Sequence, residues 1–185
     1  MRRTQKYGHV MVDLETMGNN PYSAIVSIGA VEFNLDTGEI GEKFYQTVSL
    51  QSCLDAGLIV NADTIMWWMQ QSDDARKELS TNCVDLAVAL QKFSQFMFQC
   101  EGEYCQVWGN SARFDLGILS DAYRKCTLAT PWSFRNERCV RTLVSFNPEL
   151  RKKSTFIGTQ HNALHDCLHQ IQYCNTIANT LKLKQ

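Results

Sequence analysis

The sequence predicts an α/β protein with a mixed central β-sheet flanked by helices. Its first part contains three strand-like stretches separated by turns, and the rest alternates brief apolar stretches with helical ones. Strands joined by short turns form an antiparallel meander, whereas strands separated by helices usually run parallel. Both patterns in one chain give a mixed sheet with an antiparallel N-terminal part and parallel strands after it.

Apolar runs between turn-forming residues define the N-terminal strands. We expect strands over residues 9–18, 24–33 and 43–48. Gly, Asn, Asp and Pro between these runs favour the turns. Gly29 interrupts the second strand and marks a place where another backbone approaches closely.

Helical patterns begin after residue 60. We expect helices over residues 64–71, 75–79, 84–99, 114–126, 137–146 and 163–183, with short strands over residues 106–108 and 132–134. Asp63 is a suitable N-cap for the first of these helices. Trp67 and Trp68 follow each other in that helix and so point about 100° apart. Either each packs against a different neighbour, or one is exposed for base stacking.

Length and composition are those of a globular protein. The chain has 185 residues, 44% of them hydrophobic, and a formal net charge of −1. No repeat or linker divides it, so residues 1–185 are expected to form one domain. It has neither a membrane-spanning apolar run nor a signal-peptide pattern, and we expect a cytoplasmic protein without membrane contact.

Cysteine and histidine spacing gives little support for zinc. The eight cysteines include no Cys-x-x-Cys pair, and we interpret them as reduced, mostly buried thiols. His161, His165 and His169 recur every four residues, a spacing that can hold zinc on one helix face. No third ligand fits better there than the nearby carboxylates do, so we interpret His165 and His169 as polar or partly buried helix residues.

Two carboxylates end the first expected strand. Asp13 and Glu15 are two residues apart and therefore point to the same face. Two like charges beside an apolar strand repel each other, which costs free energy unless a cation between them offsets the repulsion. A hard divalent metal is the simplest such cation. Taken alone, the pair is also compatible with a solvated strand end before the turn at Gly18.

Two more acids occur where loops lead into helices. Asp115 lies in the first turns of a helix after a short strand, where α/β sheets usually place functional side chains. His161 stands before the last helix, and Asp166 lies inside its first turns. One element can therefore present a titratable base on a loop and a carboxylate on a helix toward one point.

These motifs resemble those of the DEDDh 3′–5′ exonucleases of the RNase H-like superfamily. The resemblance is carried, in family order, by Asp13-x-Glu15, then Phe114-Asp115, then His161-x-Ala163-x-x-Asp166. It spans nearly the whole chain and looks closest to the exodeoxyribonuclease VIII-like and RNase AS-like branch that includes the phage exonuclease DexA. An RNase H-like fold follows from this resemblance as an expectation.

The resemblance implies a hydrolase that uses two Mg²⁺ or Mn²⁺ ions. Asp13, Glu15 and Asp166 would hold one ion, and Asp13 would bridge to a second, to which Asp115 contributes. Oxygen ligands select these metals over zinc. His161 would be the general base that takes a proton from the attacking water.

The implied substrate is single-stranded or 3′-tailed nucleic acid, with DNA favoured and nucleoside 5′-monophosphates as products. Five residues are expected to contact it: Thr16, Met17, Gly18, Ser111 and Phe114. A 3′–5′ exoribonuclease and a non-catalytic nucleic-acid-binding protein are the alternatives. The basic residues between positions 124 and 153 form either a phosphate-tracking surface or a solvated face. Relatives are often homodimers, which is the oligomeric state that kinship implies.

Overall fold

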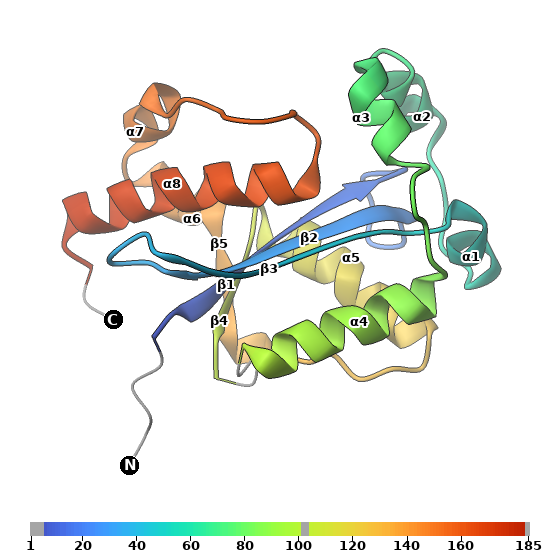
Figure 1. The fold of residues 1–185 in the computed structure, drawn as a ribbon, viewed down its shortest axis with the longest axis horizontal. Helices are drawn as coiled ribbons and strands as arrows, with labels where there is room; N and C mark the ends of the chain where they lie inside the picture. Colours follow the sequence, from blue (N-terminus) through green and yellow to red (C-terminus); the bar gives the residue numbers. More distant parts are fainter. Residues whose placement is uncertain (1–5, 101–103, 184–185) are drawn as a thin grey trace.

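A five-stranded mixed sheet forms the centre of the computed structural model, which describes residues 6–100 and 104–183 (Figure 1). The strands are β1 Gly8–Thr16, β2 Ile25–Asn34, β3 Ile40–Thr47, β4 Gln106–Gly109 and β5 Glu137–Cys139. Their order across the sheet is β3-β2-β1-β4-β5. Pairing is antiparallel among β1, β2 and β3, and parallel from β1 to β4 and from β4 to β5. The predicted mixed sheet is confirmed.

Helices cover both faces of this sheet (Figure 1). The helices in the described ranges are α1 Leu50–Asp55, α2 Ala62–Trp68, α3 Asp73–Glu78, α4 Leu86–Gln99, α5 Ala112–Lys125, α6 Val140–Ser145, α7 Pro148–Lys153 and α8 Ala163–Leu181, of which α2 and α3 lie beyond the end of the strands (Figure 1). One apolar cluster joins α4 and α5 to the sheet, and another joins α6 and α8 to its opposite face. Within the described ranges, no helix is long and apolar enough to cross a membrane.

The central strand β1 distributes its side chains between these two clusters. Val12 and Leu14 pack in the cluster that contains α4 and α5, whereas Met11 packs in the cluster that contains α8. Because side chains alternate along a strand, Asp13 and Glu15 continue the row of Met11. Both carboxylates therefore emerge on the face of the sheet that α8 covers.

Helix α8 meets the sheet at Gly29. A Cβ atom on Gly29 would lie 2.4 Å from the carbonyl carbon of Ala163, so only glycine allows this approach. One turn later, the thiol of Cys167 donates to the carbonyls of Gly29 and Met11, at 3.5 Å and 3.6 Å. The predicted close approach at Gly29 is confirmed, and it brings the first turns of α8 to the carboxylates of β1.

The segment between Pro131 and Pro148 differs from the prediction. The expected strand over residues 132–134 is wrong: residues 134–136 form a 3-10 turn, and the strand is β5. Trp132 is buried for another reason, because its ring packs edge-on against those of Phe93 and Tyr123. The helix consequently begins at Val140 and not at residue 137.

Smaller differences occur at short helices. The side chain of Asn61 accepts hydrogen bonds from the backbone N–H groups of Asp63 and Thr64, so Asn61, and not Asp63, caps α2. The helices α1 and α7 were not expected from the sequence. Each has six residues, too few to establish a periodic pattern.

Candidate active site

Four carboxylates converge beside the end of β1. Asp13 and Glu15 come from β1, Asp115 from α5 and Asp166 from α8. One oxygen atom from each of Asp13, Glu15 and Asp166 lies within 4.8 Å of the other two. All four acids line a pocket of about 220 Å³, which we call the acid pocket, and His161 lines it with them. The structure thus brings together the five residues that carry the sequence motifs.

Asp115 is held by backbone hydrogen bonds on both of its oxygens. Its Oδ1 accepts from the N–H of Leu14 at 3.3 Å, and its Oδ2 accepts from the N–H of Asn110 at 2.6 Å. The side chain is only 2% exposed. It fits there because Gly109 has no Cβ, which would lie 3.0 Å from the Cβ of Asp115. Asp115 therefore ties α5 to β1 beside the three-oxygen cluster.

The start of α8 presents a base and an acid to the acid pocket. Asn162 caps the helix, with its Oδ1 accepting the N–H groups of Leu164 and His165 at 3.1 Å and 3.0 Å. His161 precedes this cap in a left-handed conformation with φ of 63°. Asp166 Oδ2 is buried and has no hydrogen-bond partner among the described residues. An unpartnered buried carboxylate oxygen is costly unless a cation or water meets it.

Burial raises the pKa values of all four acids, and repulsion by the other acids adds to the rise at Asp13 and Glu15. Burial, followed by the charges of the other three acids, raises the pKa of Asp13 well above its ordinary value. Burial and the charges of Asp166 and Asp115 raise the pKa of Glu15 to about 8. Burial also raises the pKa of Asp115 to about 7, against its backbone hydrogen bonds. For Asp166, burial raises the pKa and the charge of His161 opposes the rise.

This donor set fits a hard divalent cation. Carboxylate oxygens are the ligands that Mg²⁺ and Mn²⁺ prefer, and a cation would offset the repulsion that raises the pKa values. The unpartnered oxygen of Asp166 also gives such an ion an open ligand position. The residues that could hold it are Asp13, Glu15 and Asp166, with Asp115 beside them.

Two adjacent tryptophans border His161 differently. The Trp67 ring is 41% exposed and meets the His161 ring edge-on, with centroids 4.8 Å apart. Trp68 is 4% exposed, and its Nε1 donates to the carbonyl of Thr16 at 2.9 Å. The two rings also lie edge-on to each other, with centroids 4.9 Å apart, so they share His161 as a neighbour and differ in exposure. Base stacking by Trp67 stays a prediction.

Among the five expected substrate contacts, Phe114 lines the acid pocket. Thr16 and Gly18 are buried, and the Thr16 hydroxyl donates to the Gly18 carbonyl at 2.6 Å. Met17 is half-buried, and its N–H donates to the carbonyl of Ala24 at 2.8 Å. The N–H of Met17 is therefore not free to bind a nucleotide.

The remaining expected contact, Ser111, begins α5. Its carbonyl accepts the N–H groups of Phe114 and Asp115, at 2.9 Å and 3.0 Å. Ser111 thus positions the helix that carries two other site residues. Its direct contact with substrate stays a prediction.

The sequence does not single out two residues that line the acid pocket, Gln170 and Arg141. Gln170 follows Asp166 by one helical turn. It is a polar residue among the buried residues of α8, and this is the feature of the sequence that could have identified it. Arg141 belongs to the basic residues between positions 124 and 153, and nothing in the sequence distinguishes it from the other basic residues there. Its charge lowers the pKa of Asp115, which places the guanidinium near the acids. Its place depends on where β5 ends, which the sequence does not reveal.

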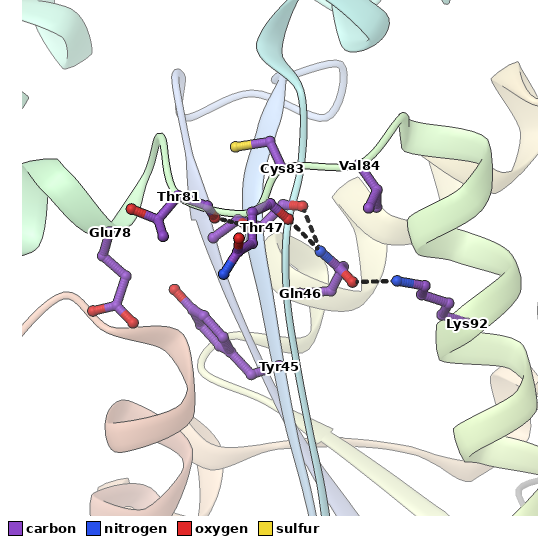
Figure 2. Close-up of a pocket in the computed structure, with 9 residues that line it drawn as sticks. Tyr45, Gln46, Thr47, Glu78, Thr81, Cys83, Val84 and Lys92 are labelled. Carbon is purple, nitrogen blue, oxygen red and sulfur yellow. Dashed lines mark hydrogen bonds between the residues drawn. The ribbon is translucent and has the colours of Figure 1, made fainter.

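A second, larger pocket lies along β3 (Figure 2). We call it the edge pocket; its volume is about 830 Å³. Lys92 Nζ donates to Gln46 Oε1 at 2.8 Å, and Gln46 Nε2 donates to the carbonyl of Asn82 at 3.1 Å. The Thr47 hydroxyl donates to the carbonyl of Thr81 at 2.5 Å. Polar groups of the edge pocket thus bond to one another.

The sequence also matches a protein family over most of its length. The model of the Rv2179c-like family, a 3′–5′ exoribonuclease domain, matches residues 8–178. The protein belongs to this family of DEDDh 3′–5′ exonucleases. This DEDDh exonuclease is 25% identical over 193 residues to the exodeoxyribonuclease of Enterobacteria phage T4, covering 87% of the chain and 85% of the relative.

Solved structures share the RNase H-like fold of this DEDDh exonuclease. The nuclease domain of 3′hExo, a DEDDh family member bound to rAMP, has a TM-score of 0.64 at 15% identity and covers 96% of this chain and 95% of that one. The zinc-bound complex of E. coli ExoI with single-stranded DNA has a TM-score of 0.59 at 14% identity, covering 94% and 40%. S. pombe Pop2p with Mg²⁺ and Mn²⁺ has a TM-score of 0.58 at 15% identity, covering 94% and 83%.

Proposed function

We propose that this exonuclease hydrolyses single-stranded or 3′-tailed nucleic acid from its 3′ end, favours DNA and releases nucleoside 5′-monophosphates. The observation that carries the proposal is the convergence of four carboxylates and His161 in the acid pocket. The T4 relative is named an exodeoxyribonuclease, whereas the family is named for an exoribonuclease. Trimming of RNA 3′ ends is therefore the second candidate function.

The acids would hold two divalent ions, Mg²⁺ or Mn²⁺. Asp13, Glu15 and Asp166 would ligate one of them, as the spacing of their oxygens supports. Asp13 would also face the second, to which Asp115 would contribute from its own place in the lining of the acid pocket. When bound, such ions polarise the scissile phosphate and lower the pKa of the attacking water. The Pop2p structure, which has Mg²⁺ and Mn²⁺ bound, supports the choice of these two metals.

His161 would accept the proton from the attacking water. It stands on the loop before α8, at the rim of the acid pocket. Imidazole is suited to this task because it can accept and release a proton near neutral pH. Asp166 lies close to His161, because the charge of His161 opposes the rise in the pKa of Asp166.

Two other residues would contact the nucleic acid itself. The exposed Trp67 ring beside His161 offers a face for stacking on a base, a contact that tolerates any sequence. Arg141 supplies a positive charge in a pocket lined by four acids, and its planar guanidinium suits a phosphate. The neutral ring would act on the base and the guanidinium on the phosphate.

Parallel digestion of DNA and RNA oligonucleotides tests the proposal. Both carry the same sequence and a 5′ label, with a 3′ tail on a duplex, and are incubated with Mg²⁺, Mn²⁺ or EDTA. We expect metal-dependent release of 5′-mononucleotides from the 3′ end, faster from DNA than from RNA. Faster release from RNA would establish the exoribonuclease alternative. Binding of both oligonucleotides without release would contradict an enzymatic function and indicate a non-catalytic binding protein.

A further inference from the structure

Gln170 makes an unusual hydrogen bond inside the core. Its side chain is 4% exposed and belongs to the buried face of α8. Its Nε2 donates to Asp13 Oδ1 at 2.7 Å. Its Oε1 is buried and has no hydrogen-bond partner within the described part of the chain. Buried polar atoms nearly always have partners, so the bare carbonyl oxygen requires an explanation.

The packing of α8 on the sheet brings Gln170 to Asp13. Gly29 is the direct sheet partner of Asp13, and it is also where the backbone of Ala163 meets β2. The thiol of Cys167 donates to the Gly29 carbonyl at 3.5 Å, which fixes the rotation of the helix. Gln170 lies three residues after Cys167 and therefore on the same face of α8. Its position beside Asp13 thus follows from the helix–sheet contact.

The chemistry of the pair fixes the orientation of the amide. A bound cation favours the ionised form of Asp13, which only accepts hydrogen bonds, so the NH₂ group of Gln170 faces Asp13. The carbonyl oxygen of Gln170 is then left for another donor. Gln170 lines the acid pocket together with Asp13 and Asp166. Asp166 also has a buried oxygen, Oδ2, without a partner among the residues described.

We propose that Gln170 is a positioning residue of the acid pocket. Its NH₂ group holds the Asp13 carboxylate in the orientation that a divalent ion requires, and its carbonyl oxygen accepts a hydrogen bond from water inside the pocket. The inference rests on the proposed function, because it concerns the same cation site. Bonds that orient metal-ligating side chains commonly matter by about 10–100-fold in metal affinity or activity.

Gln170→Leu tests this role, with Gln172→Leu as its matched control. Both substitutions place leucine on α8, but Gln172 is exposed. Leucine has a similar volume and removes both ends of the amide without adding charge. We expect Gln170→Leu to melt within a few degrees of wild type, yet to bind Mn²⁺ about 10–100-fold more weakly by calorimetry. It should need correspondingly more Mg²⁺ for half-maximal nucleotide release, while Gln172→Leu matches wild type.

A second variant covers the case in which Gln170→Leu does not fold. Gln170→Asn keeps the amide but shortens the side chain by one methylene group, so the NH₂ group cannot reach Asp13. The same weakening of Mn²⁺ binding is expected. Wild-type Mn²⁺ affinity in a folded variant overturns the inference, even where the melting temperature falls. A wild-type protein that neither binds Mn²⁺ nor releases nucleotides overturns the proposed function itself.

Discussion

The edge pocket has more space than the acid pocket, but the acid pocket has more polar groups without partners among the residues that the structure describes. The edge pocket is the larger, about 830 Å³ against about 220 Å³. Its Lys92 already donates to Gln46, so this cation is already engaged (Figure 2). The acid pocket holds four mutually repelling carboxylates, and two buried oxygens there have no partner among the described residues. Unfulfilled bonding capacity, and not volume, is therefore the reason for proposing the cation site in the acid pocket.

The elements that build the two pockets differ as well. The acids stand on β1, α5 and α8, which pack in the two apolar clusters of the core. The edge pocket is formed by the edge strand β3 and by the segment between α3 and α4, where Asn82 is left-handed with φ of 53°. Groups on packed elements keep their mutual geometry, as a cation site requires.

The largest expected effect comes from removing one charge of the acid pocket. Asp13→Asn keeps the shape of the side chain but removes the carboxylate from the three-oxygen cluster. We expect Mn²⁺ binding by calorimetry and nucleotide release to be lost together. Without metal, the variant should melt at a higher temperature than wild type, because repulsion among buried acids is reduced. Asp74→Asn, at an exposed position of α3, is the control and should change neither property.

Loss of the imidazole should separate chemistry from metal binding. We expect His161→Ala to lower kcat by about 10²–10⁴-fold, the usual contribution of a general base. Mn²⁺ affinity should survive, because His161 is not one of the three clustered oxygen donors. Steady-state release from a labelled oligonucleotide at saturating substrate and Mg²⁺ gives the measurement. Turnover equal to wild type would exclude His161 as the base.

Raised pKa values in the acid pocket should make the metal-free protein less stable as the pH rises. The pKa of Glu15 is about 8 in the folded protein against 4.5 ordinarily. Between these values the folded state binds more protons than the unfolded state, so the free energy of unfolding falls with rising pH and levels off above about 8. Asp115, with a pKa raised from 3.8 to about 7, contributes with the same sign.

Urea unfolding in EDTA across this pH range measures the effect. Glu15→Gln should show a shallower fall in the free energy of unfolding than wild type, since its side chain does not ionise. Saturating Mn²⁺ should remove most of the fall in wild type, because bound cations favour the ionised acids. If the free energy of unfolding fell equally with pH in wild type and Glu15→Gln, the pKa of Glu15 would not be raised in the folded protein, which would contradict the prediction.

The two tryptophans next to the acid pocket should respond differently. Trp67→Ala should raise KM for oligonucleotides by an amount that corresponds to about 1–3 kcal/mol of stacking, while Trp67→Phe retains most of it. Melting temperature should change little, since the ring is 41% exposed. Trp68→Phe should instead lower the melting temperature, because it removes the hydrogen bond to Thr16. An unchanged KM in Trp67→Ala would limit Trp67 to packing beside His161.

Local patterns predicted much of this molecule, and long-range contacts account for what they missed. The antiparallel strands follow from alternating apolar residues and turns, which are local signals. The strand β5 is the sequence Glu-Arg-Cys, and only its pairing with β4 makes it a strand. Convergence of the acids followed from the resemblance of ordered motifs to a family. Homodimer formation and cytoplasmic location stay predictions.

The unpredicted residues of the acid pocket have the same explanation. Gln170 matters because of the face that α8 turns toward β1, a property of packing that Gly29 sets. Arg141 reaches the acids because α6 begins directly after β5. Neither relation is encoded within a few residues of sequence, so a motif could not reveal it.

The smallest expected effect comes from the edge pocket, and it tests the comparison most directly. Tyr45 of that pocket is the sheet partner of Gly29, and Gly29 is the partner of Asp13, so the two pockets are neighbours in the sheet. Lys92→Ala and Glu78→Gln should nevertheless leave nucleotide release close to that of wild type, because neither residue lines the acid pocket. If Lys92→Ala raised KM as much as Trp67→Ala, with a salt dependence weaker than that of wild type, Lys92 would bind phosphate. The nucleic acid would then extend across β3, and volume as well as unfulfilled bonding would mark the substrate path.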